Sequence, residues 1–368
     1  MDDMLGNPFF FELPSDRWSF TDRDELLPVL GEFMRSRGRR LLVHGRRRMG
    51  KTSLIQNAAH KGKAALIYVD LSKAASLADV AKKLLDGAPS EEPGLLLKAI
   101  ELAKRHFKSI TVSALNKISL SADFRTENPR EMLEKVLNYL NDRTELEDVP
   151  RTICLDEFQD LRAIGGERPD WLLRGIIQEH RHLNYIFSGS DQRLLAWMTA
   201  AEAAFFKQLQ QMEVGPISPA HLIQWLDHRA KLGGMLERPF GESIVAVAGP
   251  CTGDVIRLAK VAFDLAAKGR VKAVASAALD SIALIELNGE FVARWADLTV
   301  GQRRLLQAVA AGKRITATDT VMEYGLRSAS TAQSAARRLL DRQILVRFAT
   351  GMDFDSPFFK RWVAVNSE

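Results

Sequence analysis

The chain has 368 residues, which is long for a single hydrophobic core, so we expect two or three domains. Its hydrophobic content of 46% and charged content of 26% are ordinary for globular proteins and exclude a mainly disordered chain. The formal net charge of +5 permits an anionic partner such as nucleic acid but does not identify one.

Three features predict a cytoplasmic protein with no membrane partner. The N-terminus opens with acidic residues and lacks the basic segment that is typical of a signal peptide. No apolar run approaches the roughly 18 residues that a membrane-spanning helix requires. Cys154 and Cys251 lack the spacing of metal ligands, which favours a reducing compartment.

Up to about residue 215 the sequence alternates between strand patterns and helix patterns. The predicted buried strands cover residues 39–45, 64–72, 151–157, 183–190 and 210–214. The predicted helices cover residues 51–60, 76–87, 93–107, 129–143 and 170–181. This alternation predicts an α/β fold in which a parallel sheet carries helices on both faces, with residues 1–215 as one domain.

One segment interrupts this alternation at about residues 108–123. Apolar residues at 110, 112 and 114, and again at 118 and 120, alternate with polar ones on either side of "LNK". This period of two predicts a two-stranded ribbon inserted before the third strand. A single irregular loop is the alternative.

The remaining sequence predicts two further domains. Residues 216–292 carry only helical patterns punctuated by glycine and proline, which predicts a helical lid. Residues 293–368 carry three short helical patterns followed by two short strands around the turn "ATGM". This order is typical of a winged helix-turn-helix domain, with Ser330 to Leu340 in the position of the recognition helix.

The stretch "GRRRMGKT" matches the phosphate-loop pattern G-x-x-x-x-G-K-[ST], and it stands between a predicted strand and a predicted helix. Lys51 would carry its charge toward the β- and γ-phosphates of ATP, and the Thr52 hydroxyl would bind Mg²⁺. A glycine-rich turn with an incidental lysine is the alternative. The predicted nucleotide contacts of the loop are Gly45, Arg46, Arg47, Arg48, Met49, Gly50, Lys51, Thr52 and Ser53.

A phosphate loop needs an acidic partner, and the predicted strand that ends "RTICLDE" supplies two. We expect Asp156 to hold Mg²⁺ and Glu157 to act as the general base that polarises the attacking water. Adjacent residues on a strand point to opposite sides, so two separate roles are geometrically reasonable.

Further polar and cationic residues are candidates for contact with the γ-phosphate. Ser188, near the end of the fourth predicted strand, is our choice for a sensor of the γ-phosphate or of water, although it could equally be a loop serine that caps the next helix. Arg193, Lys207 and Arg257 could stabilise negative charge that develops in the transition state, in their own subunit or in a neighbouring one.

Taken together, these motifs resemble the archaeal-type ATPases of the STAND and AAA+ branches of P-loop proteins. The similar stretches are "FTDRDEL", "GRRRMGKTSL", "LDEFQDL", "FSGS" and "FDSPFFKRWV". The resemblance implies an ASCE-type sheet, a helical lid, a winged helix and ATP hydrolysis at Lys51, Thr52, Asp156 and Glu157. It also implies that Phe20 and Arg23 lie near the adenine end of the nucleotide, and it makes Arg47 and Arg48 part of the loop's own pattern.

Two positions depart from the pattern of these ATPases. The chain reads Phe206-Lys207 where similar proteins often carry Gly-Arg, so an arginine expected there is missing. The segment "AGPCTGDVIRLAK" is similar to a sensor region of origin-recognition ATPases, but Arg257 comes one residue later than that pattern implies. Arg257 therefore remains a candidate nucleotide contact.

The C-terminal domain carries basic residues suited to phosphate contacts. These predicted DNA contacts are Arg327, Arg337, Arg338, Arg342 and Arg347. Short side chains at residues 332–336 leave little to read base edges, so we expect weak sequence specificity. The alternative is that the winged helix packs on the ATPase core or on a protein partner.

Three functions are compatible with these features. The leading hypothesis is an ATP-hydrolysing, Mg²⁺-dependent switch or motor that acts on DNA and forms nucleotide-dependent homo-oligomers. The alternative is a STAND-like signalling or defence switch whose winged helix binds a protein. A DNA-binding regulator with a degenerate ATPase is disfavoured, because the nucleotide motifs are unbroken.

Overall fold

A computed structural model describes most of the chain in two compact units. One unit comprises Pro14–Gly215, and the other comprises Met1–Leu13 together with Pro216–Glu368. The described residues are 6–10, 19–88, 111–112, 118–119, 128–166, 168–190, 198, 203–205, 207–234, 240–267, 276–348 and 351–366. The predicted helix at 93–107 lies outside them.

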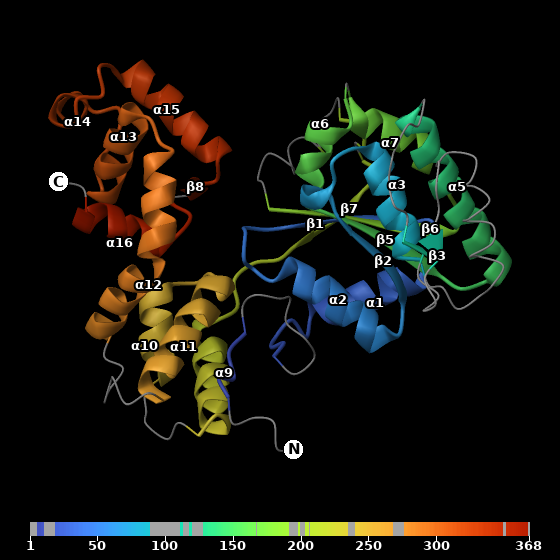
Figure 1. Cartoon of the computed structure of the whole chain (residues 1–368), viewed down its shortest axis with the longest axis horizontal. Helices are drawn as coiled ribbons and strands as arrows, with labels where there is room; N and C mark the ends of the chain where they lie inside the picture. Colours follow the sequence, from blue (N-terminus) through green and yellow to red (C-terminus); the bar gives the residue numbers. More distant parts are fainter. Residues whose placement is uncertain are drawn as a thin grey trace. The chain divides into compact units, whose positions relative to one another are not determined.

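The first unit is built on a five-stranded parallel sheet, which confirms the predicted α/β fold (Figure 1). Its strands are β1 (Arg40–His44), β2 (Ala65–Asp70), β5 (Arg151–Asp156), β6 (Leu183–Gly189) and β7 (Gln210–Glu213). They lie in the order β2-β5-β6-β1-β7. Since all five strands run the same way, the loop after β1 and the acidic residues after β5 emerge at one edge, on either side of β6.

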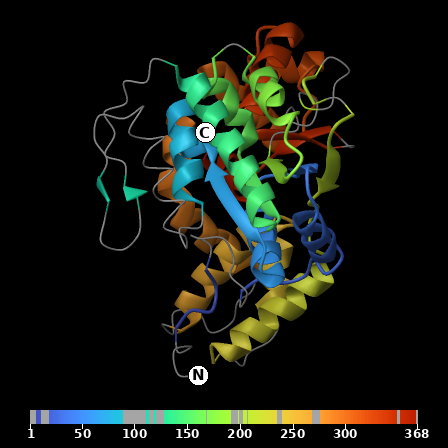
Figure 2. The ribbon, with the colours of Figure 1, turned by 90° about the vertical axis from the view of Figure 1, so that its right-hand side faces the viewer.

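Helices cover both faces of this sheet (Figure 1). One face carries α1 (Leu26–Arg35) and α2 (Lys51–Gly62), and the other carries α3 (Leu77–Asp86), α5 (Pro129–Glu147) and α7 (Pro169–Ile177). Figure 2 shows α3 and α5 side by side. Their apolar faces bury a core with Leu42, Ile153 and Phe187 of the sheet. Both helices begin at capping side chains, because Ser76 and Asn128 accept hydrogen bonds from their first turns.

Short elements occupy the connections of the sheet. The 3-10 helices η1 (Leu71–Lys73) and η2 (Phe158–Asp160) follow β2 and β5, and α6 (Leu161–Ile164) follows η2. Between α3 and α5, the strands β3 (Thr111–Val112) and β4 (Ile118–Ser119) pair antiparallel. This ribbon lies within the segment whose alternating pattern predicted two paired strands.

The second unit begins with a helical part that also includes the N-terminal segment. Its helices are α9 (Pro219–Leu232), α10 (Phe240–Ala248), α11 (Thr252–Ala267) and α12 (Ser276–Ala296). Phe9 is 1% exposed and stacks on Phe240 with ring centroids 5.6 Å apart. Arg229 donates a hydrogen bond of 2.6 Å to the Pro8 carbonyl. The sequence patterns did not predict that the N-terminus belongs with these helices.

The C-terminal part of the second unit is a winged helix, as predicted. Its elements are α13 (Val300–Ala310), α14 (Thr318–Glu323), α15 (Ala329–Asp341), β8 (Leu345–Phe348), β9 (Gly351–Phe354) and α16 (Pro357–Asn366). The residues Ser330 to Leu340 lie on α15, in the recognition-helix position.

The winged helix and the preceding helices share one hydrophobic core. Phe359 and Trp362 of α16 are buried there, and the Trp362 indole donates a hydrogen bond of 2.8 Å to Asn288 of α12. α12 runs without a break through residue 292, the end of the predicted lid. Among the described helices, none combines the length and apolar character needed to cross a membrane.

We expect Phe9→Ala to destabilise the second unit by about 3–5 kcal/mol, because it removes a buried aromatic ring and leaves a cavity. Phe10→Ala is the matched control, since Phe10 is 58% exposed. Urea unfolding followed by tryptophan fluorescence measures both changes, because Trp225 contacts Phe9. Equal stability of the two variants would show that the N-terminal segment does not hold these helices together.

Candidate nucleotide-binding site

The loop between β1 and α2 adopts backbone angles that its glycines permit. Gly45 has φ of 153°, and a Cβ atom there would come within 2.4 Å of the Val214 carbonyl oxygen. Gly50 precedes α2 with φ of 85°, in the left-handed region that glycine enters at little cost. Gly50, as the N-cap residue of α2, has no side chain that could cap its first turn. The loop therefore ends at a helix N-terminus whose positive end suits an anion.

Lys51 lies under this loop. Its side chain is largely buried, and its ammonium donates hydrogen bonds of 2.9 Å to the Gly45 carbonyl and 3.0 Å to the Arg46 carbonyl. The charge is thus held within the curve of the loop, where phosphate oxygens could replace the carbonyl contacts. Arg46 is half-buried, whereas Arg47 and Arg48 are exposed.

Arg23 connects the loop to the segment that follows β7. Its guanidinium donates hydrogen bonds of 3.0 Å to the Met49 carbonyl and 2.8 Å to the Gly215 carbonyl. Burial lowers the pKa of Arg23 from its ordinary value, and the nearby Asp22 opposes this shift. The structure thus brings Arg23 to the backbone of the predicted nucleotide loop.

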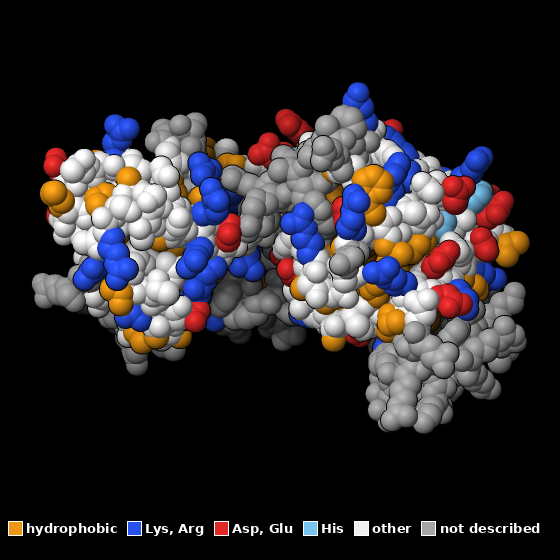
Figure 3. All heavy atoms as spheres, turned by 90° about the horizontal axis from the view of Figure 1, so that it is seen from above, with side chains coloured by type: hydrophobic (Ala, Val, Ile, Leu, Met, Phe, Trp, Pro, Cys, Tyr) orange, Lys and Arg blue, Asp and Glu red, His pale blue; other side chains and the backbone are white. Residues whose placement is uncertain are grey.

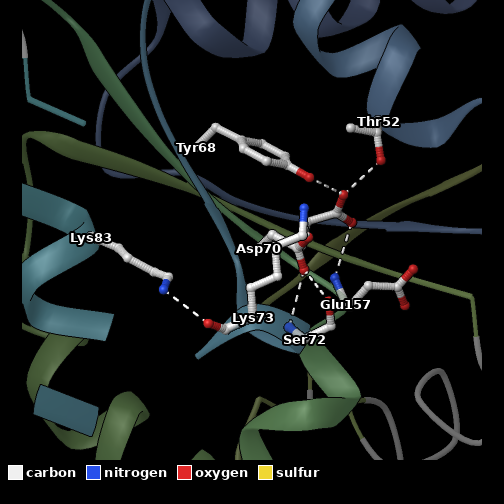
Figure 4. Close-up of polar contacts among 8 residues, drawn as sticks. Thr52, Tyr68, Asp70, Ser72, Lys73, Lys83 and Glu157 are labelled. Carbon is white, nitrogen blue, oxygen red and sulfur yellow. Dashed lines mark hydrogen bonds and ion pairs between the residues drawn. The ribbon is translucent and has the colours of Figure 1, made fainter. Parts of the chain in front are cut away.

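Asp156 and Thr52 meet at the end of β5. Asp156 is only 3% exposed, and its Oδ2 atom accepts a hydrogen bond of 2.6 Å from the Thr52 hydroxyl. Tyr68 donates a second hydrogen bond, of 2.7 Å, to the same oxygen. Figure 4 shows Thr52 and Tyr68 pointing toward this one carboxylate oxygen. The backbone N–H of Glu157 donates to the other oxygen, Oδ1, at 3.0 Å.

These residues fit a hard cation such as Mg²⁺. Because the Thr52 hydroxyl gives its hydrogen to Asp156, the lone pairs of its oxygen remain for a cation. Among the described residues there is no group of three or more His, Cys, Asp or Glu side chains that could hold a metal ion. A cation here would therefore depend on phosphate and water oxygens as well, which is how Mg²⁺ is usually bound beside nucleotides.

Glu157 has a strained backbone and an oriented carboxylate. Its φ of 49° and ψ of 48° lie in the left-handed region, which costs a non-glycine residue about 1–3 kcal/mol and is most often retained at functional sites. Its Oε2 atom accepts hydrogen bonds from Gln159, at 2.5 Å, and from Ser190, at 3.3 Å. The other oxygen, Oε1, has no such partner among the described residues.

The two serines near the end of β6 lie in different surroundings. Ser188 is within the strand, pairs in register with Val43 and is fully buried. Its hydroxyl has no hydrogen-bond partner in the part of the chain that the structure describes. Ser190 is the first residue beyond β6 and reaches Glu157. The structure therefore brings Ser190 to the acidic pair and leaves Ser188 inside the sheet.

The neighbouring strand β2 adds a third carboxylate, Asp70, and a tyrosine, Tyr68. Burial raises the pKa of Asp70, but hydrogen bonds from Ser72 and the Lys73 ammonium, 3.0 Å away, outweigh it and hold that pKa below its usual value. Figure 4 shows Lys83 donating to the Lys73 carbonyl, which supports this turn. Burial and the charge of Asp156 both raise the pKa of Tyr68, so its hydroxyl stays a donor.

The three residues predicted as candidates for stabilising the transition state differ in what the structure describes of them. Arg193 lies outside the described residues. Lys207 is exposed and has φ of 55°. Arg257 belongs to the second unit, where its guanidinium forms an ion pair of 2.9 Å with Glu290.

The basic residues of the winged helix also differ from one another. Arg327, Arg337, Arg338 and Arg347 are exposed, and within the described residues their guanidinium groups form no hydrogen bond or ion pair. Arg342 donates to the carbonyl of Asp297 and forms an ion pair with its carboxylate. The charge of Arg342 is therefore already balanced by Asp297.

The sequence patterns missed Tyr68 and Gln159 as neighbours of the acidic pair. Tyr68 comes two residues before the end of its strand, on the strand next to β5. That position was the available signal, because a residue near the carboxyl end of a neighbouring parallel strand can reach the same edge of the sheet.

Comparisons with known families agree with this geometry. A family model described as "AAA domain" matches residues 34–198, and one described as "Probable winged helix domain" matches residues 289–365. No curated protein matches the sequence. The loop, the parallel sheet and the AAA match define the chain as a P-loop ATPase. It combines an AAA domain with a C-terminal winged helix, the architecture implied by the resemblance to archaeal-type ATPases.

Solved structures share this fold over nearly the whole chain. The Walker-type ATPase PABY2304 of Pyrococcus abyssi is 19% identical, with a TM-score of 0.69, over 97% of this chain and 99% of that one. The ADP form of the Aeropyrum pernix ORC2 protein is 16% identical, with a TM-score of 0.54, over 98% and 95%. The Aeropyrum pernix ORC1 protein in complex with DNA is 15% identical, with a TM-score of 0.53, over 100% and 95%. At these identities the likeness establishes the fold alone.

We expect Ser190→Ala to lower ATP turnover roughly 10- to 100-fold, because it removes one of the two donors to Oε2 of Glu157 and loosens the position of that carboxylate. Ser188→Ala is the matched comparison on the same strand. It removes a buried hydroxyl that has no described partner, so its loss of turnover should be smaller and its stability no lower. Steady-state phosphate release and thermal unfolding measure both variants, and a larger loss for Ser188→Ala would contradict this assignment.

Proposed function

We propose that the protein is a Mg²⁺-dependent ATPase in which ATP binding and hydrolysis control contact of the winged helix with DNA, in homo-oligomers in the cytoplasm. The observation that carries the proposal is the placement of Lys51, Thr52, Asp156 and Glu157 at one edge of the sheet. The exposed arginines of the winged helix supply the second part.

In this proposal the phosphate loop binds the nucleotide. Its backbone and the first turn of α2 surround the phosphates, and the Lys51 ammonium exchanges its carbonyl contacts for phosphate oxygens. Thr52 and Asp156 would hold the cation. Bound Mg²⁺ neutralises charge on the β- and γ-phosphates.

Glu157 is the proposed general base. Gln159 and Ser190 both donate to Oε2, so Oε1 is the atom that can accept a proton from the attacking water. The strained backbone of Glu157 fixes the start of this side chain. Arg193, Lys207 and Arg257 remain candidates for stabilising the transition state, and Arg257 would first have to leave Glu290.

We expect Glu157→Gln to lower turnover at least about 100-fold while ATP binding persists, because the amide keeps the shape but cannot take a proton. Lys51→Ala should lose nucleotide binding. Lys61→Ala is a matched control, since Lys61 is an exposed lysine at the other end of α2. Phosphate release and equilibrium binding of a fluorescent ATP analogue give the two readouts. Unchanged hydrolysis in Glu157→Gln or Lys51→Ala would refute the proposed site.

The winged helix is the proposed DNA contact. Figure 3 shows Lys and Arg side chains spread over the face of the winged-helix domain that carries α14 and α15. The exposed surface of α15 offers Ser330, Thr331 and Ser334 beside Arg337 and Arg338. Arginines contact phosphates, whereas short hydroxyl side chains read few base edges, so binding should be weakly sequence-specific. The ORC1 structure of the same fold contains DNA, which supports this assignment.

We expect Arg337→Ala to weaken binding to a short duplex and to reduce the slope of log affinity against log salt by about 0.9, the loss of one phosphate contact. Arg342→Ala removes the same charge from the same domain, but Asp297 already holds that guanidinium, so the slope should change little. Fluorescence anisotropy over a salt series measures both slopes. Equal slopes in the two variants, or no salt-sensitive binding at all, would favour a protein partner instead.

A further inference from the structure

Tyr68 holds the Asp156 carboxylate from a strand that carries none of the nucleotide motifs. Ile67 and Val69, on either side of it, are buried in the core beneath α3 and α5. Because side chains alternate along a strand, Tyr68 points to the opposite face of the sheet, which α2 covers. Its ring is half-buried there, and its hydroxyl reaches Asp156 at 2.7 Å.

The carboxylate receives three donors from three separate elements. Thr52 comes from α2, Tyr68 from β2 and the Glu157 N–H from the connection after β5. Thr52 and Tyr68 share Oδ2, and the backbone donor takes Oδ1. Because these hydrogen bonds engage both oxygens, they fix the plane and the rotation of the Asp156 side chain.

The two hydroxyl donors are not equivalent once a cation binds. In the proposed function the Thr52 oxygen is itself a ligand, so its position depends on the cation as well as on Asp156. Tyr68 has no such second task in the described structure, and it lies on a rigid strand paired along its length with β5. It can hold Asp156 in one orientation whether or not the cation is present.

We propose that Tyr68 is a positioning residue for the cation that accompanies the nucleotide, acting through the Asp156 carboxylate. This inference rests on the proposed function, because it assumes that Asp156 and Thr52 hold that cation. Groups that hydrogen-bond to a metal-binding carboxylate typically change metal affinity by about 10- to 100-fold when they are removed. Tyr68 should therefore set how much Mg²⁺ the nucleotide complex requires.

The test is the Mg²⁺ dependence of nucleotide binding in Tyr68→Phe, which keeps the ring and removes only the hydroxyl. A fluorescent ADP analogue is titrated in the presence of EDTA and then over a series of Mg²⁺ concentrations. We expect affinity in EDTA to stay within about twofold of the unsubstituted protein, while the half-saturating Mg²⁺ concentration rises about 10-fold. The readout is binding, so it does not depend on turnover.

The matched control is Tyr324→Phe, the same chemical change at a half-buried tyrosine of the winged helix. It should leave the Mg²⁺ titration unchanged. A Mg²⁺ requirement that is equal in Tyr68→Phe and the unsubstituted protein would overturn the inference. A loss of nucleotide affinity in EDTA of about 10-fold in Tyr68→Phe would also overturn it, because that result would indicate a general structural role.

Failure of the proposed function would look different. If the unsubstituted protein bound the analogue with no dependence on Mg²⁺, the assignment of Thr52 and Asp156 to a cation would be wrong. That outcome is read before any variant is compared, so it is separate from a failure that concerns Tyr68 alone.

Discussion

The geometry of the ATPase unit depends on the hydrogen bonds that the Asp156 carboxylate accepts. It is buried, so it must be fully hydrogen-bonded, and its donors come from α2, β2 and the backbone after β5. Those elements are far apart in sequence, and only a parallel sheet brings their ends to one edge. The hydrogen bonds to Asp156 therefore hold the start of α2, and with it the phosphate loop, close to Glu157.

Local patterns in the sequence were sufficient to predict the architecture. Four of the five strands are short apolar runs between turn residues, whereas β7 reads Gln-Gln-Met-Glu. The loop motif identifies the strand that precedes α2, so the sequence predicts both the sheet and the winged helix. The contact between Thr52 and Asp156 also follows from the two motifs together. These predictions succeed because each of them rests on a pattern contained within about ten residues.

Other features depend on distances that no local pattern contains. Ser188 and Ser190 both lie at the end of the predicted strand 183–190, and the sequence does not distinguish them. In the structure β6 ends at Gly189, so the Ser188 hydroxyl is buried within the strand and the Ser190 hydroxyl reaches Glu157. The resemblance implies that Arg23 lies near the adenine end of the nucleotide, and in the structure two backbone carbonyls hold its guanidinium. Arg342 and Arg337 are both basic residues predicted to contact DNA, but Asp297 forms an ion pair with Arg342. In each case a partner distant in sequence decides what the side chain can do.

The burial of Phe9 among the helices of the second unit has a topological consequence. The chain leaves that unit after Leu13, forms the whole ATPase unit and returns at Pro216, so the units are joined by two connections. The second unit is therefore built from two separate stretches of the chain, and its core can be completed only after the whole ATPase unit, which lies between them in sequence, has been made.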